Sequence, residues 1–328
     1  MKTQQKLVVN ENMNSYPKFF NQLRLLVIVS AMFLTGCLDD NLSVVSEINE
    51  EFSGIEKIEV DGGFLEVEYI GESGMQDVSM DAVLRSNSDK RYEIIYNVDG
   101  ETLKIEIKTS KGISGNLKGE GQILLKGPRN ILLDLESGSG KLSVQNVVST
   151  ETNMTVASGS IFANNISATN IFLSSSSGSV KAEDLTGKLN AVVSSGKMEF
   201  SGIDGNIDAD GSSGELKFNG INGVVNATIS SGKIEMNNVR FLGKMHLTSG
   251  QLFATNSGLG AETSLKVSSG SIYIQTLSNL SSFNFNITTG SGIARVGSQQ
   301  ASGSLIINNG ASNTIRGEVS SGKIEIEN

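Results

Sequence analysis

Apolar and polar residues alternate in short runs that recur along the second half of the chain. Each run follows a Ser-Gly step: after Ser195-Gly196, Met198 and Phe200 would face inward while Lys197 and Glu199 face outward. Alternation with a period of two predicts half-buried β-strands. The marker glycines of these steps recur every 18–20 residues, at Gly140, Gly159, Gly178, Gly196, Gly214, Gly232, Gly250 and Gly270, and less regularly at Gly290 or Gly292, Gly303 and Gly322.

A constant interval of this length predicts a solenoid, in which each repeat forms one coil stacked on the next. We therefore expect an all-β fold, a single-stranded parallel β-helix (β-solenoid) with coils of about 18–20 residues. The usual handedness of parallel crossovers favours the right-handed form. The repeated glycine is expected at a tight corner that requires positive φ.

The outward positions carry a second pattern, in which the sign of the charge alternates from coil to coil. Because neighbouring strands lie about 4.8 Å apart, every charge would face opposite charges on adjacent coils. A slip of one residue would carry these charges into the core, so the pattern predicts the register. One column contains Lys197, Glu215 and Lys233, and the next contains Lys181, Glu199, Lys217 and Glu235.

The pattern divides the chain into four parts. Residues 1–36 are interpreted as a lipoprotein signal peptide and the acidic residues 37–52 as a tether. Strand-like runs of irregular length predict an N-terminal cap and first irregular coils over 53–130. The regular β-solenoid is expected over 131–328.

The first segment contains a ten-residue apolar run, Leu25 to Leu34, preceded by cations. A membrane-spanning helix needs about 20 apolar residues, so a signal peptide is favoured. The run ends in Leu34-Thr35-Gly36-Cys37, which resembles the bacterial lipobox and implies a lipid anchor at Cys37. Leu38, and not Asp, follows the cysteine, which in a Gram-negative host favours the outer membrane over the inner one by the rule of that motif. Surface and periplasmic orientations both stay open, as does the start at Met1 or Met13.

Charge and cysteine content limit the partners. Cys37 is the only cysteine, which excludes an internal disulfide and a cysteine metal cluster. Residues 1–36 carry four cations and one anion, so the rest of the chain has 22 Lys and Arg against 34 Asp and Glu, a net charge of −12. An acidic surface repels nucleic acid, so we expect no nucleic-acid partner.

His246, the only histidine, is expected in an outward column with Asn190, Asp208 and Asn226. A catalytic triad would need a nucleophile and an orienting carboxylate converging on it, and no elbow motif is present. We favour an exposed structural role.

The spacing of one acidic corner nearly matches a calcium-binding loop. The loop would need glycine where Ala209 stands, so a polar outer face is favoured and calcium is the weaker alternative. The five candidate ligands are Asp204, Asn206, Asp208, Asp210 and Glu215.

Three outward aromatic residues share the column of Glu235: Phe162, Phe253 and Tyr273. They could form a binding strip for a carbohydrate or a protein. An aromatic ladder that stabilises the sheet is the interpretation we favour.

The repeats resemble a bacterial family of extracytoplasmic β-helical proteins that carry the provisional label of adhesins, similar to the head GIN-domain group. The resemblance depends on Ser320 to Ile326 and its copies, on Gly220-Ile221-Asn222-Gly223 and on the lipoprotein start, and it covers about residues 53–328. It implies a single parallel β-helix with a role at the cell surface, and it implies no catalytic residues and no cofactor.

The sequence therefore predicts a non-catalytic cell-envelope lipoprotein that acts as an interaction or adhesion scaffold through its solenoid face. One alternative is a polysaccharide-active β-helix enzyme, for which only the corner from Asp204 to Asp210 supplies carboxylates. Another is a scaffold that stacks end to end through Lys323-Ile324-Glu325-Ile326, because these residues end the chain without a polar cap.

Overall fold

The computed structural model describes residues 42–110 and 118–328, and residues 42–328 form one compact unit. Nearly all of the regular structure in these residues is β-strand, and one 3₁₀ turn lies at Leu280–Ser282. The strands are β1 (Ser43–Phe52), β2 (Lys57–Asp61), β3 (Glu66–Glu72), β4 (Val78–Ser86), β5 (Tyr92–Asp99), β6 (Thr102–Thr109), β7 (Gly119–Pro128), β8 (Leu132–Ser137), β9 (Lys141–Val156), β10 (Ser160–Ile203), β11 (Ile207–Ser257), β12 (Leu259–Thr276), β13 (Phe283–Thr289), β14 (Ile293–Val296), β15 (Gln299–Ala301), β16 (Ser304–Ile307) and β17 (Asn313–Glu327).

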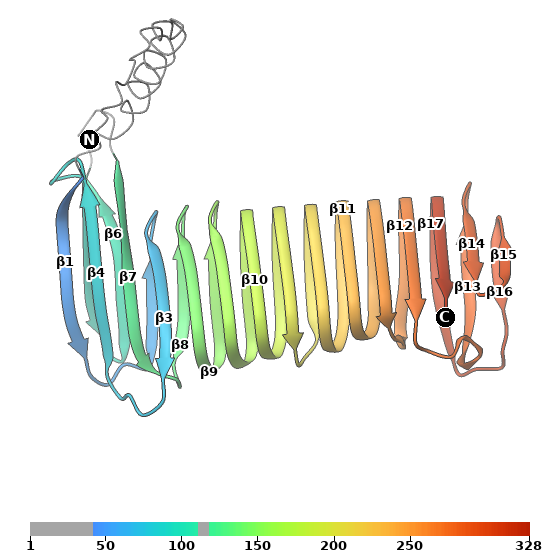
Figure 1. Ribbon diagram of the computed structural model, residues 1–328, viewed down its shortest axis with the longest axis horizontal. Coiled ribbons are helices and arrows are strands. Elements are labelled where there is room, and N and C mark those ends of the chain that lie inside the picture. The colour runs from blue at the N-terminus through green and yellow to red at the C-terminus, as the bar shows by residue number, and fades with distance from the viewer. Residues whose placement is uncertain (1–41, 111–117) are drawn as a thin grey trace, which may run out of the picture. The chain divides into compact units, whose positions relative to one another are not determined.

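Strands β9 to β12 wind into a stack of parallel coils (Figure 1). The pairing continues around the corners, so β10 and β11 run unbroken for 44 and 51 residues. Residues at one position in successive coils are 19 apart at Leu142 and Ile161, 18 apart at Met198 and Leu216, and 20 apart at Leu252 and Ile272. The predicted all-β solenoid and its coil length are confirmed, and its right-handed sense stays a prediction.

The inward residues of each coil form columns through the middle of the stack. Met198 and Leu216 are fully buried on adjacent coils, and Phe200 packs on Phe218 with ring centroids 5.2 Å apart. No single coil could bury such side chains, because each contributes only one layer. The apolar residues of the alternating pattern therefore form the core.

The first coil lies one layer inside the N-terminal end. Strand β2 pairs in parallel with β6 on one side and with β8 on the other, and β3 lies in the same way between β7 and β9. The segment that follows β3 folds back over this coil, with β4 antiparallel to β7 and β5 antiparallel to β6. The N-terminal cap is thus built from residues later in the chain than the coil it covers.

The expected tether is shorter than the sequence indicated. Residues 43–52 form β1, which pairs antiparallel with β4 from Ser43 opposite Ser86 to Phe52 opposite Val78. The glutamates of this segment predicted a solvated linker. They are equally compatible with an edge strand, in which most side chains face water. The remainder, 37–41, lies outside the described residues.

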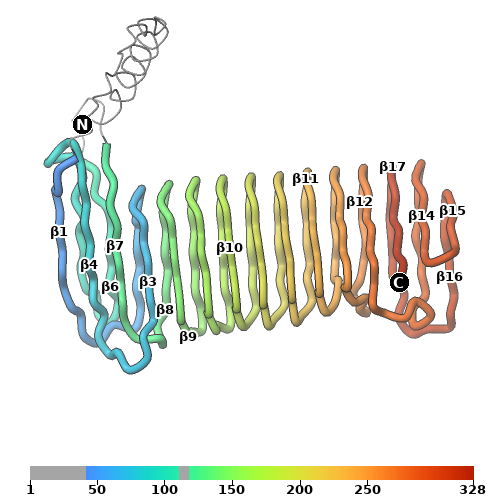
Figure 2. Tube along the Cα trace, viewed as in Figure 1, coloured from blue at the N-terminus to red at the C-terminus, as the bar shows by residue number. Residues whose placement is uncertain are grey.

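The C-terminal end mirrors this arrangement, with outer strands that come earlier in the chain than the coil they cover, and this corrects the expected regular solenoid. After β12 the chain makes an excursion over 277–312, and β17 then returns to pair directly with β12, Gly322 beside Gly270. Strands β13 and β14 pair with the outer side of β17, and β16 and β15 add antiparallel strands beyond them. Figure 2 shows the C-terminus on β17, inside β14 and β15.

The residues Lys323 to Ile326 therefore do not form the open end of the stack. They lie between β12 and β14, with Ile324 and Ile326 fully buried. The sequence-based expectation of stacking through these residues is wrong, because a strand that is last in sequence is not last in space.

Candidate functional site

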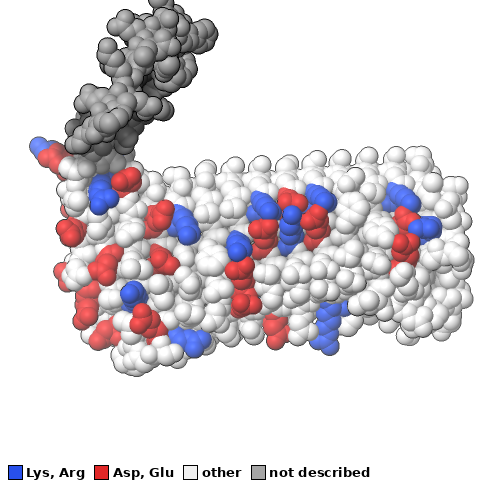
Figure 3. All heavy atoms as spheres, viewed as in Figure 1, with Lys and Arg blue, Asp and Glu red and all other residues white. Residues whose placement is uncertain are grey.

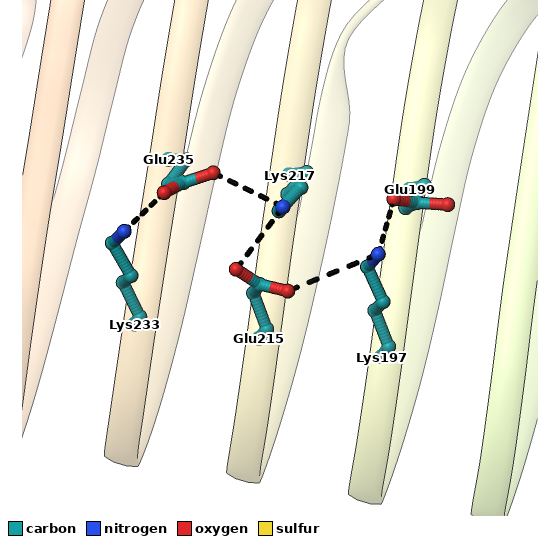
Figure 4. A network of polar contacts seen from close by, with 6 residues as sticks. All are labelled: Lys197, Glu199, Glu215, Lys217, Lys233 and Glu235. Atoms are coloured by element: carbon teal, nitrogen blue, oxygen red, sulfur yellow. Dashed lines mark hydrogen bonds and ion pairs between the residues drawn. The ribbon is translucent and has the colours of Figure 1, made fainter.

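Six charged residues on three adjacent coils form a regular network of ion pairs on the outward surface, here called the charge ladder. Within each coil a lysine and a glutamate two residues apart form an ion pair, at 2.5 Å between Lys197 and Glu199 and 3.2 Å between Lys217 and Glu215. Figure 4 shows the network of Lys197, Glu199, Glu215, Lys217, Lys233 and Glu235.

Contacts between coils join these pairs. Lys217 Nζ lies 3.3 Å from Glu235 Oε2, and Lys197 Nζ lies 3.9 Å from Glu215 Oε2. Hydrogen bonds to Glu215 and Glu235 raise the pKa of Lys217 above its ordinary value. A hydrogen bond from Lys233, helped by one from Lys217, lowers the pKa of Glu235. The ladder thus stabilises the charged forms of Lys217 and Glu235.

Lys181 extends the column but bonds differently from the prediction. Its Nζ pairs with Glu183 on the same coil at 2.8 Å, and Glu199 on the next coil acts on it only through its charge. The hydrogen bond to Glu183 is the main reason why the pKa of Lys181 is raised. Sequence reasoning missed Glu183 because it followed two outward columns of charges, and Glu183 stands in a third.

The three aromatic residues do not form one strip. Phe253 and Tyr273 are neighbours, with ring centroids 6.3 Å apart, whereas Phe162 is separated from them by the coils of the ladder. Lysines lie over two of the rings: Lys181 Nζ is 5.7 Å from the centroid of Phe162, and Lys233 Nζ is 5.4 Å from that of Phe253. Cation–π contacts of this kind extend the alternation of the ladder at both of its ends.

A second polar cluster, here called the C-terminal lock, joins β12, β14 and β17. Arg295 of β14 contacts Glu325 and, at 2.7 Å, Glu327, and Tyr273 of β12 donates a 2.5 Å hydrogen bond to Glu327. Lys323 also contacts Glu325, which is 9% exposed. Sequence reasoning missed this cluster because β17 lies between β12 and β14 in space, although it follows both in the chain. This position brings Tyr273 and Arg295 next to the glutamates of β17.

The hydrogen bond between Tyr273 and Glu327 also affects titration. It raises the pKa of the Tyr273 hydroxyl and lowers the pKa of the Glu327 carboxyl. Glu327 receives a second hydrogen bond from Arg295, which adds to this lowering. The lock therefore holds a neutral phenol against a charged carboxylate at neutral pH.

Charged groups of the ladder and the lock lie on one face, separated by the aromatic and uncharged residues of the coils between them (Figure 3). A depression of about 370 Å³ lies beside the ladder, between Phe253 and Phe218. It is an open surface depression and not an enclosed cavity. This face can bind a surface more readily than it can enclose a small molecule.

His246 occupies a different column from the predicted one. It lies opposite Lys266 of β12, and Lys266 pairs with Glu318 at 3.1 Å. In the other direction the 18-residue interval leads to Thr228 and Asp210, not to Asn226 and Asp208. The prediction assigned it to a column two residues away, because it did not follow the interval from coil to coil.

The candidate calcium ligands are engaged separately. Asn222 donates a 2.8 Å hydrogen bond to Asp204, and Asp208 accepts one of 2.7 Å from Asn226 and pairs with Lys188 at 3.3 Å. The Asn206 side chain accepts from the backbone of Val224, and Glu215 belongs to the ladder. Asp210 lies opposite Val192. Within 42–110 and 118–328, no three His, Cys, Asp or Glu side chains are grouped to hold a metal ion.

One corner of the coil is formed by residues with left-handed backbone, which sequence reasoning did not identify. Asn165 donates a 2.7 Å hydrogen bond to Asn146 one coil earlier, so the column is also linked through side chains. Asparagine, aspartate and glycine adopt this conformation at least cost. Their recurrence every 18 or 19 residues was the available signal: Asn146, Asn165, Asp184, Gly202, Gly220, Asn238 and Asn256.

Two features concern the membrane. Cys37, the predicted lipidation site, lies outside the described residues, as does the predicted signal peptide. Among the residues that the structure describes, no helix has the length and apolar character needed to cross a membrane.

Solved structures similar to this chain include three bacterial proteins with provisional names. A cell adhesion protein, provisionally so named, from Clostridium sporogenes ATCC 15579 is 13% identical, with 86% of this chain and 99% of that chain covered and a TM-score of 0.21. A provisionally named lipid-binding protein from Parabacteroides distasonis ATCC 8503 is 17% identical, with 85% and 96% covered and a TM-score of 0.38. A provisionally named adhesin from Bacteroides fragilis NCTC 9343 is 13% identical, with 86% and 97% covered and a TM-score of 0.30.

No curated protein sequence matches this chain significantly. The family model described as Toastrack DUF4097 matches residues 38–219 and 222–327, which is more than half of the chain. This match confirms the family resemblance inferred from the repeats. With its stacked parallel coils and the extent of this match, the chain belongs to the Toastrack DUF4097 family.

Proposed function

We propose that this protein is a non-catalytic scaffold of the bacterial cell envelope, exported and anchored through a lipid on Cys37. It presents the outward face of its solenoid to a protein or carbohydrate partner. The observation that carries the proposal is the position of β1, which begins at Ser43, only six residues after Cys37. Six residues span at most about 20 Å. An anchor at Cys37 would hold the N-terminal end of the stack close to the membrane.

The charges of the ladder and of the lock support a binding role over a catalytic one. Their carboxylates are matched by lysine or arginine, and the pKa of Glu235 is lowered. A general acid would need a raised pKa near the working pH. A flat face of matched charges is suited to contact with another surface, where electrostatic complementarity selects the partner.

Labelling and fractionation of bacteria that express the full chain would test the anchor. We expect the wild-type chain to incorporate radioactive palmitate and to sediment with membranes, and the outer membrane fraction is favoured by Leu38. Cys37→Ser should lose the label and leave the membrane fraction. A Cys37→Ser chain that remains membrane-bound without lipid would contradict the anchor.

Protease treatment of intact cells would test display. If the solenoid faces outward, added protease should remove the wild-type chain while a periplasmic marker is spared. Protection in intact cells, with digestion only after permeabilisation, would place the scaffold in the periplasm and would contradict a role in adhesion between cells.

A further inference from the structure

We propose that the C-terminal end of the solenoid is a self-association surface, at which the edge strands of one molecule pair with the same strands of a second copy. This surface, here called the C-terminal edge, consists of β15 (Gln299–Ala301) and β16 (Ser304–Ile307). The pairing itself does not depend on the proposed function. Its consequence for cells rests on the anchor proposed above.

Each strand of the C-terminal edge has one free side. In the part of the chain that the structure describes, strand β16 pairs with β13 alone, and β15 pairs with β14 alone. Thr289 of β13 donates its backbone N–H to Gly303, which places Gly303 in a hydrogen-bonded pair. Because such pairs alternate along an antiparallel ladder, Leu305 and Ile307 direct their backbone groups to β13. Ser304 and Ile306 direct theirs to the free side.

The C-terminal edge lacks most of the devices that normally prevent strand addition. Edge strands are usually protected by being very short, by charges, by proline or by a bulge. Of these only shortness applies here, with three residues in β15 and four in β16. Residues 297–315 contain no Asp, Glu, Lys, Arg or Pro. Ile306 is 70% exposed, which is unusual for an isoleucine on a strand. The edge therefore offers unpaired backbone groups beside an exposed apolar side chain.

The N-terminal end has the opposite character. Among residues 42–110 and 118–328, its edge strands with one unpaired side are β1 and β5, and both carry acidic residues. Glu47, Glu50 and Glu51 lie on β1, while Glu93 and Asp99 lie on β5. Like charges placed opposite one another oppose pairing. The two ends of the stack thus differ in their readiness to accept a further strand.

This difference selects the second copy and its orientation. Two N-terminal ends would bring acidic strands together. An N-terminal end against a C-terminal end would place the glutamates of β1 against Ile306, and the cation in that row, Arg316, lies two strands further in. Two C-terminal ends bring uncharged strands together. In an antiparallel, two-fold arrangement Ser304 and Ile306 of each copy face Ile306 and Ser304 of the other, and the two Ile306 side chains lie diagonally across the axis.

The contact would be small and weak in solution, because only two short strands take part. Many copies on one surface would strengthen it through multivalency. With the N-terminal ends held at a membrane, joined C-terminal ends would belong to molecules on two facing membranes. The geometry therefore points to like-to-like adhesion between cells.

Sedimentation equilibrium of residues 37–328, which include the whole compact unit, would test the pairing. We expect the wild type to dimerise at high concentration. Ile306→Lys and Ile306→Glu should each weaken dimerisation at least about tenfold, and an equal mixture should restore it to within about threefold, since opposite charges then meet across the two-fold axis. The matched control is Val192→Lys, because Val192 is an exposed apolar residue in the middle of the stack. This variant should dimerise as the wild type does.

Vesicles would test the geometry. Cys37 is the only cysteine, so residues 37–328 can be coupled through it to maleimide lipid in phosphatidylcholine vesicles. Wild-type vesicles should cluster with one another. Vesicles that carry Ile306→Lys should not cluster among themselves, but they should cluster with vesicles that carry Ile306→Glu.

Two results would overturn the proposal and leave the anchoring and display results unaffected. One is a wild type that stays monomeric at millimolar concentration. Binding of a different protein at this end would not rescue the proposal, because the proposed partner is a second copy of the chain. The other is a pair of charge variants that each dimerise, or cluster their vesicles, as the wild type does.

Discussion

Steric exclusion at single glycines determines how closely the coils can stack. A Cβ added to Gly214 would overlap the carbonyl oxygen of Gly196, and one added to Gly232 would overlap that of Gly214. The same holds at Gly159 and Gly178. Each of these four glycines thus allows the backbone of the adjacent coil to pass directly over it.

Replacement of Gly214 by alanine should destabilise the protein by at least about 2 kcal/mol, because φ at Gly214 is 131° and the added methyl group has no room. Gly211→Ala is the matched control in the same coil. Its Cβ would meet nothing nearer than 3.5 Å, so its free energy of unfolding should change little or rise slightly. Urea unfolding of both variants measures the difference, and equal losses would contradict the steric argument.

The sequence predicted only part of this role. Positive φ was expected at every marker glycine, and it is found at Gly196, Gly214 and Gly232 but not at Gly159 or Gly178. Contact with the carbonyl of the coil below is common to all five. That contact depends on the distance between coils, which no local sequence pattern contains.

Within the strands, the charge ladder should make stability depend on pH. The pKa of Glu235 is lowered from its ordinary value of 4.5, so the folded state binds the proton less readily than the unfolded state. The stabilisation is present above about pH 4.5 and is lost as pH falls through the lower, folded-state pKa. Glu235→Gln should therefore be less stable than the wild type at pH 7, and the gap should close as the pH falls below 4.5 and through the folded-state pKa of Glu235.

Urea midpoints at about pH 7, 4 and 3 measure this effect. Salt provides the control, because about 1 M NaCl screens exposed ion pairs and should narrow the gap at neutral pH as well. A gap that is constant across pH would show that Glu235 contributes by packing and not by charge.

The C-terminal lock should hold β14 against β17. Arg295→Met leaves the nearly buried Glu325 with Lys323 as its remaining ionic partner, which should weaken the docking of β14 on β17 by about 1–2 kcal/mol. Amide hydrogen exchange in β14 should accelerate about tenfold while exchange in β10 stays unchanged. Arg240→Met is the control, since Arg240 is exposed and donates a hydrogen bond to Asn222 within β11, away from the C-terminal lock. Equal acceleration in both variants would contradict a local role for the lock.

Sequence patterns identified the elements better than their order in space. The run Ser320-Ser321-Gly322-Lys323 matches interior coils, and the structure places it against β12 as such a coil. What the pattern could not show is that residues 283–307 lie outside it. Strands with a period of two look alike whether they pair parallel or antiparallel, so the excursion and its lock were hidden.

At the scale of the whole molecule, the two-coil period of the ladder makes a prediction about length. Duplication of residues 197–214 adds one coil and places Lys197 next to its own copy and Glu199 next to its own copy. Duplication of residues 197–232 adds two coils and keeps the alternation of sign. Both chains should fold, because the core columns repeat in every coil.

Salt should distinguish the two chains. NaCl at about 0.5 M should raise the urea midpoint of the one-coil duplication relative to that of the two-coil duplication, since it screens the new like-charge contacts. An identical salt response in both would show that the alternation has no energetic effect.

The insertion of β17 has a consequence for synthesis and quality control. Strands β13 and β14 leave the ribosome before β17, yet their contact with the stack is through β17. They cannot dock until the segment that follows them arrives, so this end of the molecule is assembled last. A chain that stops short of β17 would expose β12 and leave the preceding hairpins without a support, as a substrate for proteases. Cells would therefore retain intact molecules and remove truncated ones without a dedicated recognition signal.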